Sequence, residues 1–236
     1  MARTPIWQSI KRSLTADIAE GRFATGDRLP TEAQLAGRFG VNRHTVRRAL
    51  AVMAEDGLVH SRRGSGVFVA AAPADYPIGR RVRFHQNIAS GGRIPTKKVL
   101  SLAVQAAGAE EAAALEIAAG AEVLVYDGLS LADGQPVAVF QSMFPSDRLP
   151  GLAGALEATA SVTEALAACG VADYTRVSTR ITAKEATATQ ALHLQIAEGA
   201  PILRTVGINA GPDGRPVEFG RTWFAGDRVT LTVGED

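Results

Sequence analysis

The stretch Gly40-Val41-Asn42-Arg43-His44-Thr45-Val46-Arg47-Arg48-Ala49-Leu50 decides the fold of the first seventy residues. Gly40 can end one helix and Asn42 can cap the next, which leaves only a tight turn between them. The apolar residues of the second helix recur at helical spacing, with an expected inner face of Val46, Ala49, Leu50 and Met53. The pattern predicts a helix-turn-helix whose second helix is the recognition helix.

The segments on either side predict the rest of a winged helix-turn-helix. Upstream, Trp7, Ile10, Leu14 and Ile18 recur at helical spacing until Gly21, and Thr31 opens another helix with Gln34 as capping-box partner. Downstream, the apolar runs 58–61 and 66–69 flank the polar tip Arg62-Arg63-Gly64-Ser65 and predict a hairpin.

The polar residues of this region form a basic set suited to double-stranded DNA. Arg43 and Arg47 lie four residues apart on the outward face, and each can donate two hydrogen bonds to guanine O6 and N7. Hydroxyls and imidazole nearby can add phosphate contacts. A basic helix can also be a mere solvated face, but the start of a recognition helix and a hairpin tip are where a winged helix meets DNA. The expected DNA-binding residues are Thr31, Asn42, Arg43, His44, Thr45, Arg47, Arg62, Arg63 and Gly64.

Charge and composition agree with this interpretation. Residues 1–70 carry eleven Lys and Arg against six Asp and Glu, whereas residues 71–236 carry fourteen against eighteen. The asymmetry indicates that the first part meets a polyanion. No apolar run approaches the ~18 residues of a membrane span, and the N-terminus has no signal-peptide pattern. The single cysteine, Cys169, fits a reducing cytoplasm and is expected to pack rather than react.

The remainder of the chain contains an internal repeat. Residues 115–121 match 194–200, and Asp133-Gly134-Gln135-Pro136-Val137 matches Asp213-Gly214-Arg215-Pro216-Val217, at an offset of 79 that becomes 80. Each unit predicts helix, strand, Asp-Gly turn and strand, and hence one antiparallel sheet with helices on a face. The small, proline-bearing segment 71–78 predicts a linker. The chain is therefore expected to be α+β, with a DNA-binding domain at 1–70 and a second domain at 79–236.

These motifs resemble known families. Gly26–Ala36, Val41–Leu50 and Arg63–Val69 closely resemble the GntR family of bacterial regulators, and the C-terminal part looks like the UTRA effector domain of its HutC branch. Within that branch, Arg83–Asn87 and Asp173–Arg176, with 222–228, look like PhnF-like regulators of phosphonate metabolism. The resemblance implies a homodimer on a near-palindromic operator, a chorismate-lyase-like effector domain and a small ligand that changes DNA affinity.

A candidate effector site follows partly from the residues and partly from the resemblance. A phosphonate or phosphate needs arginines and hydroxyls. The resemblance adds the Ser-x-Thr position at Ser161 and Thr163 and the glutamate Glu218. The candidate residues are Ser161, Thr163, Arg176, Arg180, Glu218, Arg83 and Asn87.

Several of these assignments have plain structural alternatives. Ser161 can be only a helix cap, with Glu164 as its capping-box partner, and Arg83 only an ion-pair residue. Asp147-Arg148 and Asp227-Arg228 occur in both repeats, so they are expected to be turn architecture rather than ligand contacts.

The function expected is that of a transcription regulator, more specifically a repressor, in the cytoplasm and without a cofactor. The strand 126–130 lacks the basic residues of sugar-phosphate-sensing relatives, which counts against a phosphosugar. An effector that is a sugar phosphate or carboxylate, and a constitutive DNA binder with a structural C-terminal domain, remain alternatives. An enzyme is not expected, because the four histidines show no metal-ligand spacing and no Ser-His-Asp arrangement is evident.

Overall fold

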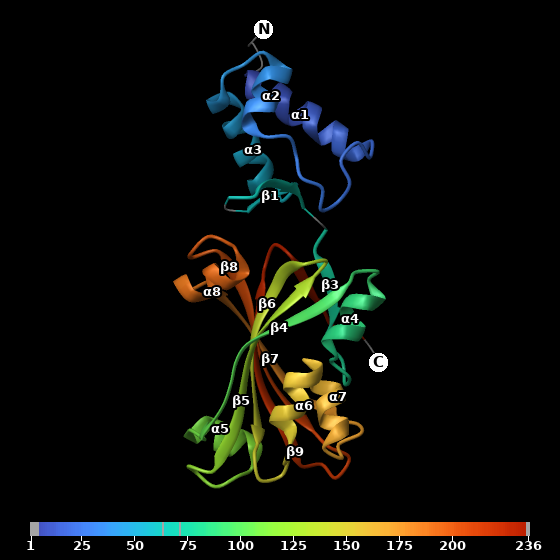
Figure 1. Ribbon diagram of the computed structural model, residues 1–236, viewed down its shortest axis with the longest axis vertical. Helices are drawn as coiled ribbons and strands as arrows, with labels where there is room; N and C mark the ends of the chain where they lie inside the picture. Colours follow the sequence, from blue (N-terminus) through green and yellow to red (C-terminus); the bar gives the residue numbers. More distant parts are fainter. Residues whose placement is uncertain (1–4, 63, 71, 235–236) are drawn as a thin grey trace. The chain divides into compact units, whose positions relative to one another are not determined.

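The computed structural model describes residues 5–62, 64–70 and 72–234, and it divides into two compact units between Ala72 and Pro73. Figure 1 shows helices and a hairpin in the first unit and a large sheet with helices in the second.

The N-terminal unit is the winged helix-turn-helix that the sequence predicts. Its elements are α1 (Ile6–Ala19), α2 (Glu32–Phe39), α3 (Arg43–Glu55), β1 (Val59–Arg62) and β2 (Gly66–Val69). The two strands pair antiparallel, from Val59 with Val69 to Arg62 with Gly66. The predicted inner face of α3 is confirmed, because Val46, Ala49, Leu50 and Met53 are all buried in one core with Leu14 of α1 and Leu35 of α2.

Local hydrogen bonds explain where α2 and α3 begin. The Thr31 hydroxyl accepts from Gln34 N and the Gln34 side chain accepts from Thr31 N, so the predicted capping box is present. Asn42 Oδ1 accepts from Thr45 N at 2.9 Å. Gly40 takes a φ of 64°, a left-handed conformation that glycine adopts without strain, and this ends α2. Gly40, Asn42 and Thr45 therefore set the tight turn between the two helices.

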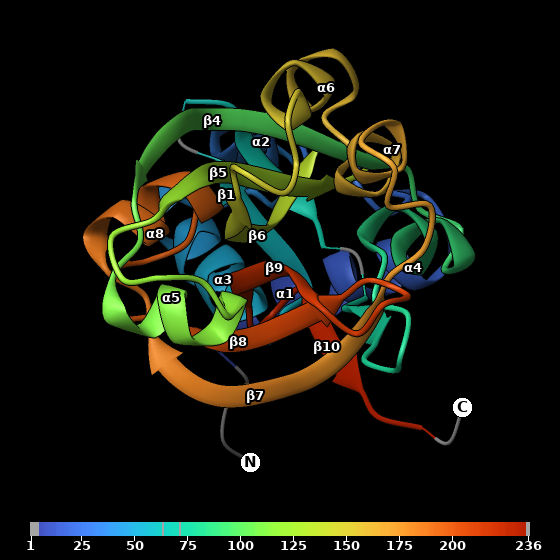
Figure 2. The same ribbon diagram turned by 90° about the horizontal axis from the view of Figure 1, so that it is seen from below.

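The C-terminal unit is built on one six-stranded antiparallel sheet in the order β4-β5-β6-β9-β8-β7. Figure 2 shows β4 at one edge of the sheet and β7 at the other. The strands are β4 (Pro95–Ala106), β5 (Glu122–Ala132), β6 (Gln135–Pro145), β7 (Thr175–Glu185), β8 (Pro201–Ala210) and β9 (Pro216–Ala225).

Five helices accompany this sheet. They are α4 (Phe84–Ser90), α5 (Ala109–Leu115), α6 (Leu152–Thr159), α7 (Val162–Ala168) and α8 (Ala188–Leu194). α6 and α7 lie next to each other (Figure 1) and bury Leu156 and Leu166 against Tyr126 and Phe144 of the sheet. This α+β arrangement agrees with the fold class expected from the sequence.

The internal repeat appears as two related halves of the sheet. β4, α5, β5 and β6 form one half, and β7, α8, β8 and β9 form the other, so that the halves meet at the β6–β9 pair. The first hairpin turns at Asp133 and Gly134, both with positive φ, as the Asp-Gly pattern predicts.

The repeated Asp-Arg pairs are architecture, as expected. Arg148 donates to the carbonyls of Leu115 and Glu116 at the end of α5 and to Pro216 O of the other half. Arg228 makes the equivalent bonds to Leu194, Gln195 and Pro136. Each arginine therefore closes a helix end and joins the two halves of the sheet.

The expected linker of residues 71–78 is wrong from Ala74 onward. Ala74–Pro77 forms a strand, β3, that pairs in parallel with β10 (Val229–Thr232) near the other end of the chain. Tyr76 on β3 is buried beside Phe224, with ring centroids 5.1 Å apart. The segment is small and proline-bearing, but its backbone donors and acceptors are satisfied by a strand some 150 residues away, which no local pattern reveals.

Candidate functional site

The exposed face of α3 carries the residues expected to read DNA. Arg43 and His44 are exposed in its first turn. Arg47 is exposed as well, but two of its donors are occupied, because Nε donates to Glu32 Oε1 at 3.0 Å and Nη2 to Glu32 Oε2 at 2.8 Å. The interpretation of Arg47 as an unconstrained fork for guanine is therefore incomplete, because Glu32 holds one side of the guanidinium.

The two threonines of the expected DNA surface take part in the helix caps. The Thr45 hydroxyl donates to Asn42 Oδ1 at 3.0 Å, and the Thr31 hydroxyl bonds to Gln34 Oε1 at 2.9 Å. At the hairpin tip, Gly64 adopts a φ of 75°. Arg63 and the side chain of Arg62 lie outside the described residues, so their expected contacts with DNA stay predictions.

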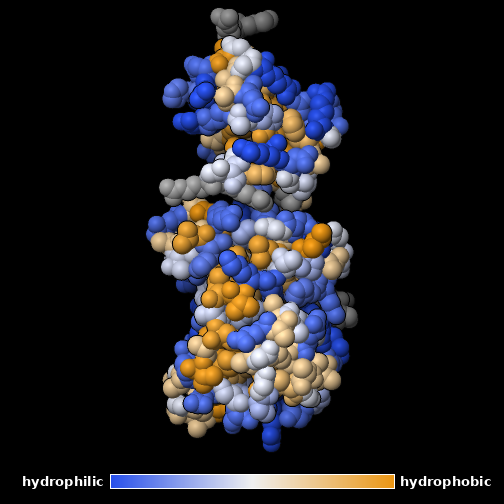
Figure 3. Space-filling model, viewed as in Figure 1, coloured by the Kyte–Doolittle hydropathy of each residue, from blue (hydrophilic) through white to orange (hydrophobic). Residues whose placement is uncertain are grey.

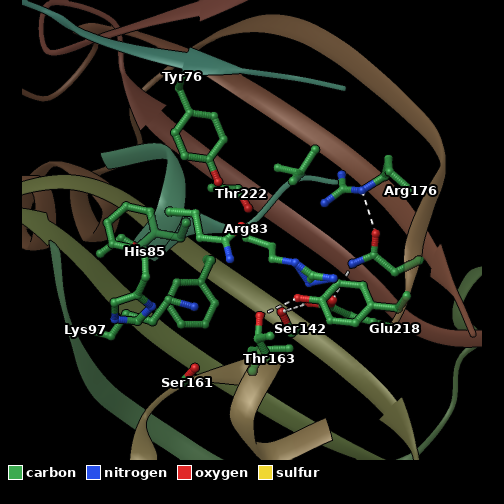
Figure 4. A pocket seen from close by; sticks show the side chains of 18 of the residues that line it. Tyr76, Arg83, His85, Lys97, Ser142, Ser161, Thr163, Arg176, Glu218 and Thr222 are labelled. Atoms are coloured by element: carbon green, nitrogen blue, oxygen red, sulfur yellow. Dashed lines mark hydrogen bonds between the residues drawn. The ribbon is translucent and has the colours of Figure 1, made fainter. Parts of the chain in front are cut away.

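The C-terminal unit contains a cavity of about 250 Å³ above the middle of the sheet (Figure 4). Its walls come from β3, the start of α4, the sheet strands and the start of α7. Five residues of the candidate effector site line it, namely Arg83, Ser161, Thr163, Arg176 and Glu218. Five of the seven candidate residues therefore lie together in the structure, although they are up to 135 positions apart in the sequence.

Arg83 is a charged residue of the cavity lining, although its accessible fraction is only 9%. Its Nη2 donates to Asp173 Oδ1 at 2.6 Å, and its guanidinium lies 4.6 Å from the Tyr174 ring centroid. The hydrogen bond from Arg83 holds the pKa of the Asp173 carboxyl below its usual range. Nη1 of Arg83 is buried and has no hydrogen-bond partner among the described residues. Arg83 is thus an ion-pair residue of the cavity lining with one nitrogen left unpartnered.

Lys97 of β4 is a second cation of the cavity, and the sequence analysis missed it. Its ammonium lies 4.5 Å from the centroid of the Phe140 ring and 5.7 Å from that of Phe84. Burial lowers the pKa of Lys97 to about 8. The neighbouring His85 also has a lowered pKa, first through burial and then through the charge of Lys97. Lys97 is therefore a cation that titrates close to neutral pH.

The internal repeat supplies the signal that could have found Lys97. Lys97 pairs with Ser130 across β4 and β5, and Arg176 pairs with Asn209 across β7 and β8. The two pairs are related by the repeat offset of 79, and all four residues line the cavity. The cavity therefore spans the junction of the two halves, with one cation from each.

A chain of hydrogen bonds links four residues of the cavity lining, namely Arg176, Asn209, Glu218 and Ser142. Arg176 Nε donates to Asn209 Oδ1 at 2.8 Å, and Asn209 Nδ2 donates to Glu218 Oε2 at 2.6 Å. Ser142 donates to the other carboxylate oxygen of Glu218 at 2.6 Å. Figure 4 shows this chain beside the labelled Arg83. Glu218 is buried, and each of its two carboxylate oxygens accepts a hydrogen bond from an uncharged donor.

The α7 residues contribute hydroxyls. Ser161 Oγ accepts from Glu164 N at 3.3 Å, so Ser161 is the helix cap that the alternative interpretation proposed, and it lines the cavity too. The expected capping box with Glu164 is wrong, because Ser161 N donates to Thr159 Oγ1 instead. The hydroxyls of Thr163 and Tyr174 lie 2.8 Å apart. Among the described residues, no three His, Cys, Asp or Glu side chains gather as a metal-ligand set.

Two candidate residues do not belong to the cavity lining. Arg180 is exposed on β7 and pairs with Val206, whereas Arg176 pairs with Asn209. A register shift between Arg176 and Ser178 inverts the alternation of β7, so the two arginines lie on opposite faces although they are four residues apart. Asn87 is buried, but its side chain donates to Pro77 O and ties α4 to β3.

Gly207 gives a test of the position of Arg176. A Cβ at Gly207 would overlap the Arg176 guanidinium, and the flexible arginine would have to move. Gly207→Ala should therefore leave the thermal unfolding of the chain nearly unchanged while weakening binding of an anion in the cavity about tenfold, as measured by calorimetric titration. The control is Gly154→Ala on α6, where a Cβ meets open space. Equal binding by both variants would show that Arg176 does not contact the anion.

The comparisons with known proteins agree with both units. The model of the bacterial regulatory proteins of the gntR family matches residues 7–69, and that of the UTRA domain matches residues 90–230. An uncharacterized HTH-type transcriptional regulator of Rhizobium meliloti is 38% identical over 97% of this chain and 94% of its own length. The probable transcriptional regulator PhnF of Escherichia coli is 31% identical over 96% and 94%.

A solved structure extends this similarity to the fold. The crystal structure of PhnF from Mycobacterium smegmatis superposes with a TM-score of 0.65 at 25% identity, and covers 98% of this chain and 99% of its own. A winged helix-turn-helix joined to a ligand-binding domain defines a transcriptional regulator rather than an enzyme. The chain belongs to the gntR family of bacterial regulatory proteins, with a UTRA domain, in the HutC-type arrangement. DNA binding and binding of a small-molecule effector follow from these two domains. No helix of the described part of the chain is long and apolar enough to cross a membrane.

Proposed function

We propose that this regulator represses genes of phosphonate uptake or metabolism and leaves its operator when a small phosphorus-containing anion occupies the cavity. The observation that carries the proposal is Arg83, a nearly buried arginine with one unpartnered nitrogen, which lines a cavity together with Arg176 and Lys97. A buried donor without a partner costs free energy, and an oxyanion would remove that cost. Similarity to PhnF and to the histidine utilization repressor of Pseudomonas putida supports the regulatory part.

The size of the cavity favours a compact ligand. Pockets for drug-sized ligands have volumes of roughly 300–1,000 Å³, whereas this cavity has about 250 Å³. Among the sheet strands, β4 and β7 supply the basic residues Lys97 and Arg176, and the β5 segment from Tyr126 to Ser130 offers none. Both features favour a small phosphonate or phosphate compound over a sugar phosphate.

The chain path suggests how the cavity affects the DNA-binding unit. Tyr76, on the strand that begins the C-terminal unit, lines the cavity, as do Arg83 and the next residues, Phe84, His85 and Gln86. An anion bound to Arg83 therefore contacts the segment that follows the boundary at Ala72. A ligand shifts the operator affinity only by preferring one conformation of the dimer, and a coupling of about 1–3 kcal/mol gives a 5–150-fold change.

The homodimer expected of this family is part of the proposal. The edge strands expose apolar side chains, Val99 and Val104 on β4 and Val177 and Ile181 on β7. Figure 3 shows hydrophobic residues gathered on one face of the C-terminal unit. Light scattering of the purified chain should give twice the mass of one chain, and a monomer at micromolar concentration would contradict the dimer.

The decisive experiment is a titration with phosphonates, phosphate esters, sugar phosphates and carboxylates, each followed by thermal shift and by release of selected operator DNA. Arg83→Gln should weaken binding of the active anion by tenfold or more, because it removes a charged donor. Arg81→Gln is the matched control, since Arg81 also pairs with Asp173 but does not line the cavity. A constitutive DNA binder would show no shift with any compound, and this would overturn the proposed sensing.

Binding of the anion should also depend on pH through Lys97. Its pKa near 8 means that the charge is present at pH 7 and is lost as the pH rises to 9. The affinity for a phosphate ester should therefore fall several-fold over this range, although the ester, with a second pKa of about 6, keeps its charge. Calorimetric titration at both pH values measures this, and Lys97→Met should bind more weakly but with little pH dependence. An affinity that rises with pH in the wild type would exclude this role.

A further inference from the structure

Glu32 and Arg47 form a two-point ion pair between the two helices of the helix-turn-helix. Arg47 Nε and Nη2 each donate to a different carboxylate oxygen, at 3.0 and 2.8 Å. The Arg47 side chain remains 63% exposed and that of Glu32 is 33% exposed. A single exposed ion pair contributes at most about 1 kcal/mol to stability. Stability alone is therefore a weak reason for a carboxylate on this surface.

The pair leaves a defined set of donors on Arg47. A guanidinium has five N–H groups, and Glu32 takes the Nε–H and one Nη2–H. Three N–H groups remain. One on Nη1 and one on Nη2 point in parallel away from the chain as the end-on fork, and the second Nη1–H points to the side. Two of these can be donated in parallel to guanine O6 and N7. Glu32 thus fixes the plane of Arg47 without using the edge that reads a base.

The negative charge of Glu32 also favours contact of Arg47 with a base over contact with a phosphate. Its hydrogen bond to Arg47, and beyond it the charges of Arg47, Arg43 and His44, keep the pKa of Glu32 below its usual range. The carboxylate is therefore ionised at any pH at which DNA is bound. An ionised carboxylate repels phosphate oxygens and offsets the positive charge of Arg47, which weakens any contact of Arg47 with the DNA backbone.

We propose that Glu32 is a positioning residue for sequence recognition, which holds Arg47 side-on so that its end-on fork faces a base edge and not a phosphate. The inference rests on the DNA binding of the N-terminal unit. It implies that the affinity for the correct operator depends on Glu32, whereas the affinity for unrelated DNA does not. Removing the charge should therefore lower specificity without lowering binding to DNA in general.

The test uses the full chain and its operator, selected from a random DNA library by the wild-type protein. Glu32→Gln should reduce the ratio of operator affinity to scrambled-duplex affinity about fivefold or more, and relax the preference at one base pair of each half-site. Binding to the scrambled duplex should stay equal or become tighter. Glu55→Gln, on the exposed end of α3, makes the same change of charge and should leave the base preferences unchanged.

A double-mutant cycle separates positioning from a structural role. In an Arg47→Ala background, Glu32→Gln should have no further effect on the specificity ratio, because the side chain that it positions is absent. The same loss in both backgrounds, or an unchanged base profile in Glu32→Gln alone, would overturn the inference. If the wild-type chain enriched no sequence from the library, sequence-specific DNA binding itself would fail, and the inference with it.

Discussion

Arg228→Met should lower the free energy of unfolding of the C-terminal unit by at least about 3 kcal/mol, the largest effect that we expect on stability. Arg228 is buried and donates to the carbonyls of Pro136, Leu194 and Gln195 at 2.7, 2.6 and 3.1 Å. Methionine fills part of the space but leaves these carbonyls without their donor, at about 1–3 kcal/mol each. Scanning calorimetry of the full chain should show the corresponding transition lowered by roughly 6–12 °C.

The control for this variant is Arg180→Met. Arg180 is exposed on β7, so the same loss of charge should change the transition by little. Arg148→Met should have an intermediate effect, because Arg148 makes the equivalent bonds but is only half-buried. If Arg228→Met unfolded at the temperature of the wild type, the contacts between the two halves would not carry the stability assigned to them.

Arg43→Ala should reduce affinity for the selected operator 5–150-fold, corresponding to about 1–3 kcal/mol for a bidentate contact with guanine. Arg43 is exposed in the first turn of α3, at the end of a recognition helix that contacts base edges. The preference at the contacted base pair should be lost as well. Fluorescence anisotropy with the operator and with single-base variants measures both effects.

Arg12→Ala removes the same charge from the exposed surface of α1. It should leave the base preferences intact, even where the general attraction to phosphates falls. An Arg43→Ala protein that binds the operator within twofold of the wild type would show that α3 does not read bases in the manner proposed.

The N-terminal unit was predictable nearly in full because its signals are local. A cap at Asn42, a left-handed Gly40 and a 3.6-residue apolar period each act within one or two turns. The Glu32–Arg47 pair was not predictable in the same way. Its partners are fifteen residues apart in different helices, and their contact depends on how α2 crosses α3.

The cavity was predictable only in part, for reasons specific to strands. A period of two would place Arg176 and Arg180 on one face, but the extra residue at Val177 reverses the face within three residues. Such a bulge leaves little trace in the sequence. A different ambiguity affects β4. Lys97 and Lys98 are adjacent, and the sequence pattern does not tell which of them points toward the cavity.

The two halves of the C-terminal unit are related but not identical, so the two ends of the cavity between them differ. A chamber at the junction of two identical halves would present the same groups to both ends of whatever it holds. Here the halves have diverged, since Glu218 has Ala138 as its counterpart and Phe140 has Gly220, at the same offset of 80 that relates Ser142 to Thr222. A symmetric diacid would set one of its charges against Glu218, whereas a head-to-tail asymmetric molecule would not. The repeated pattern of the two halves therefore shapes the chamber, and the positions at which the halves differ make its two ends unlike.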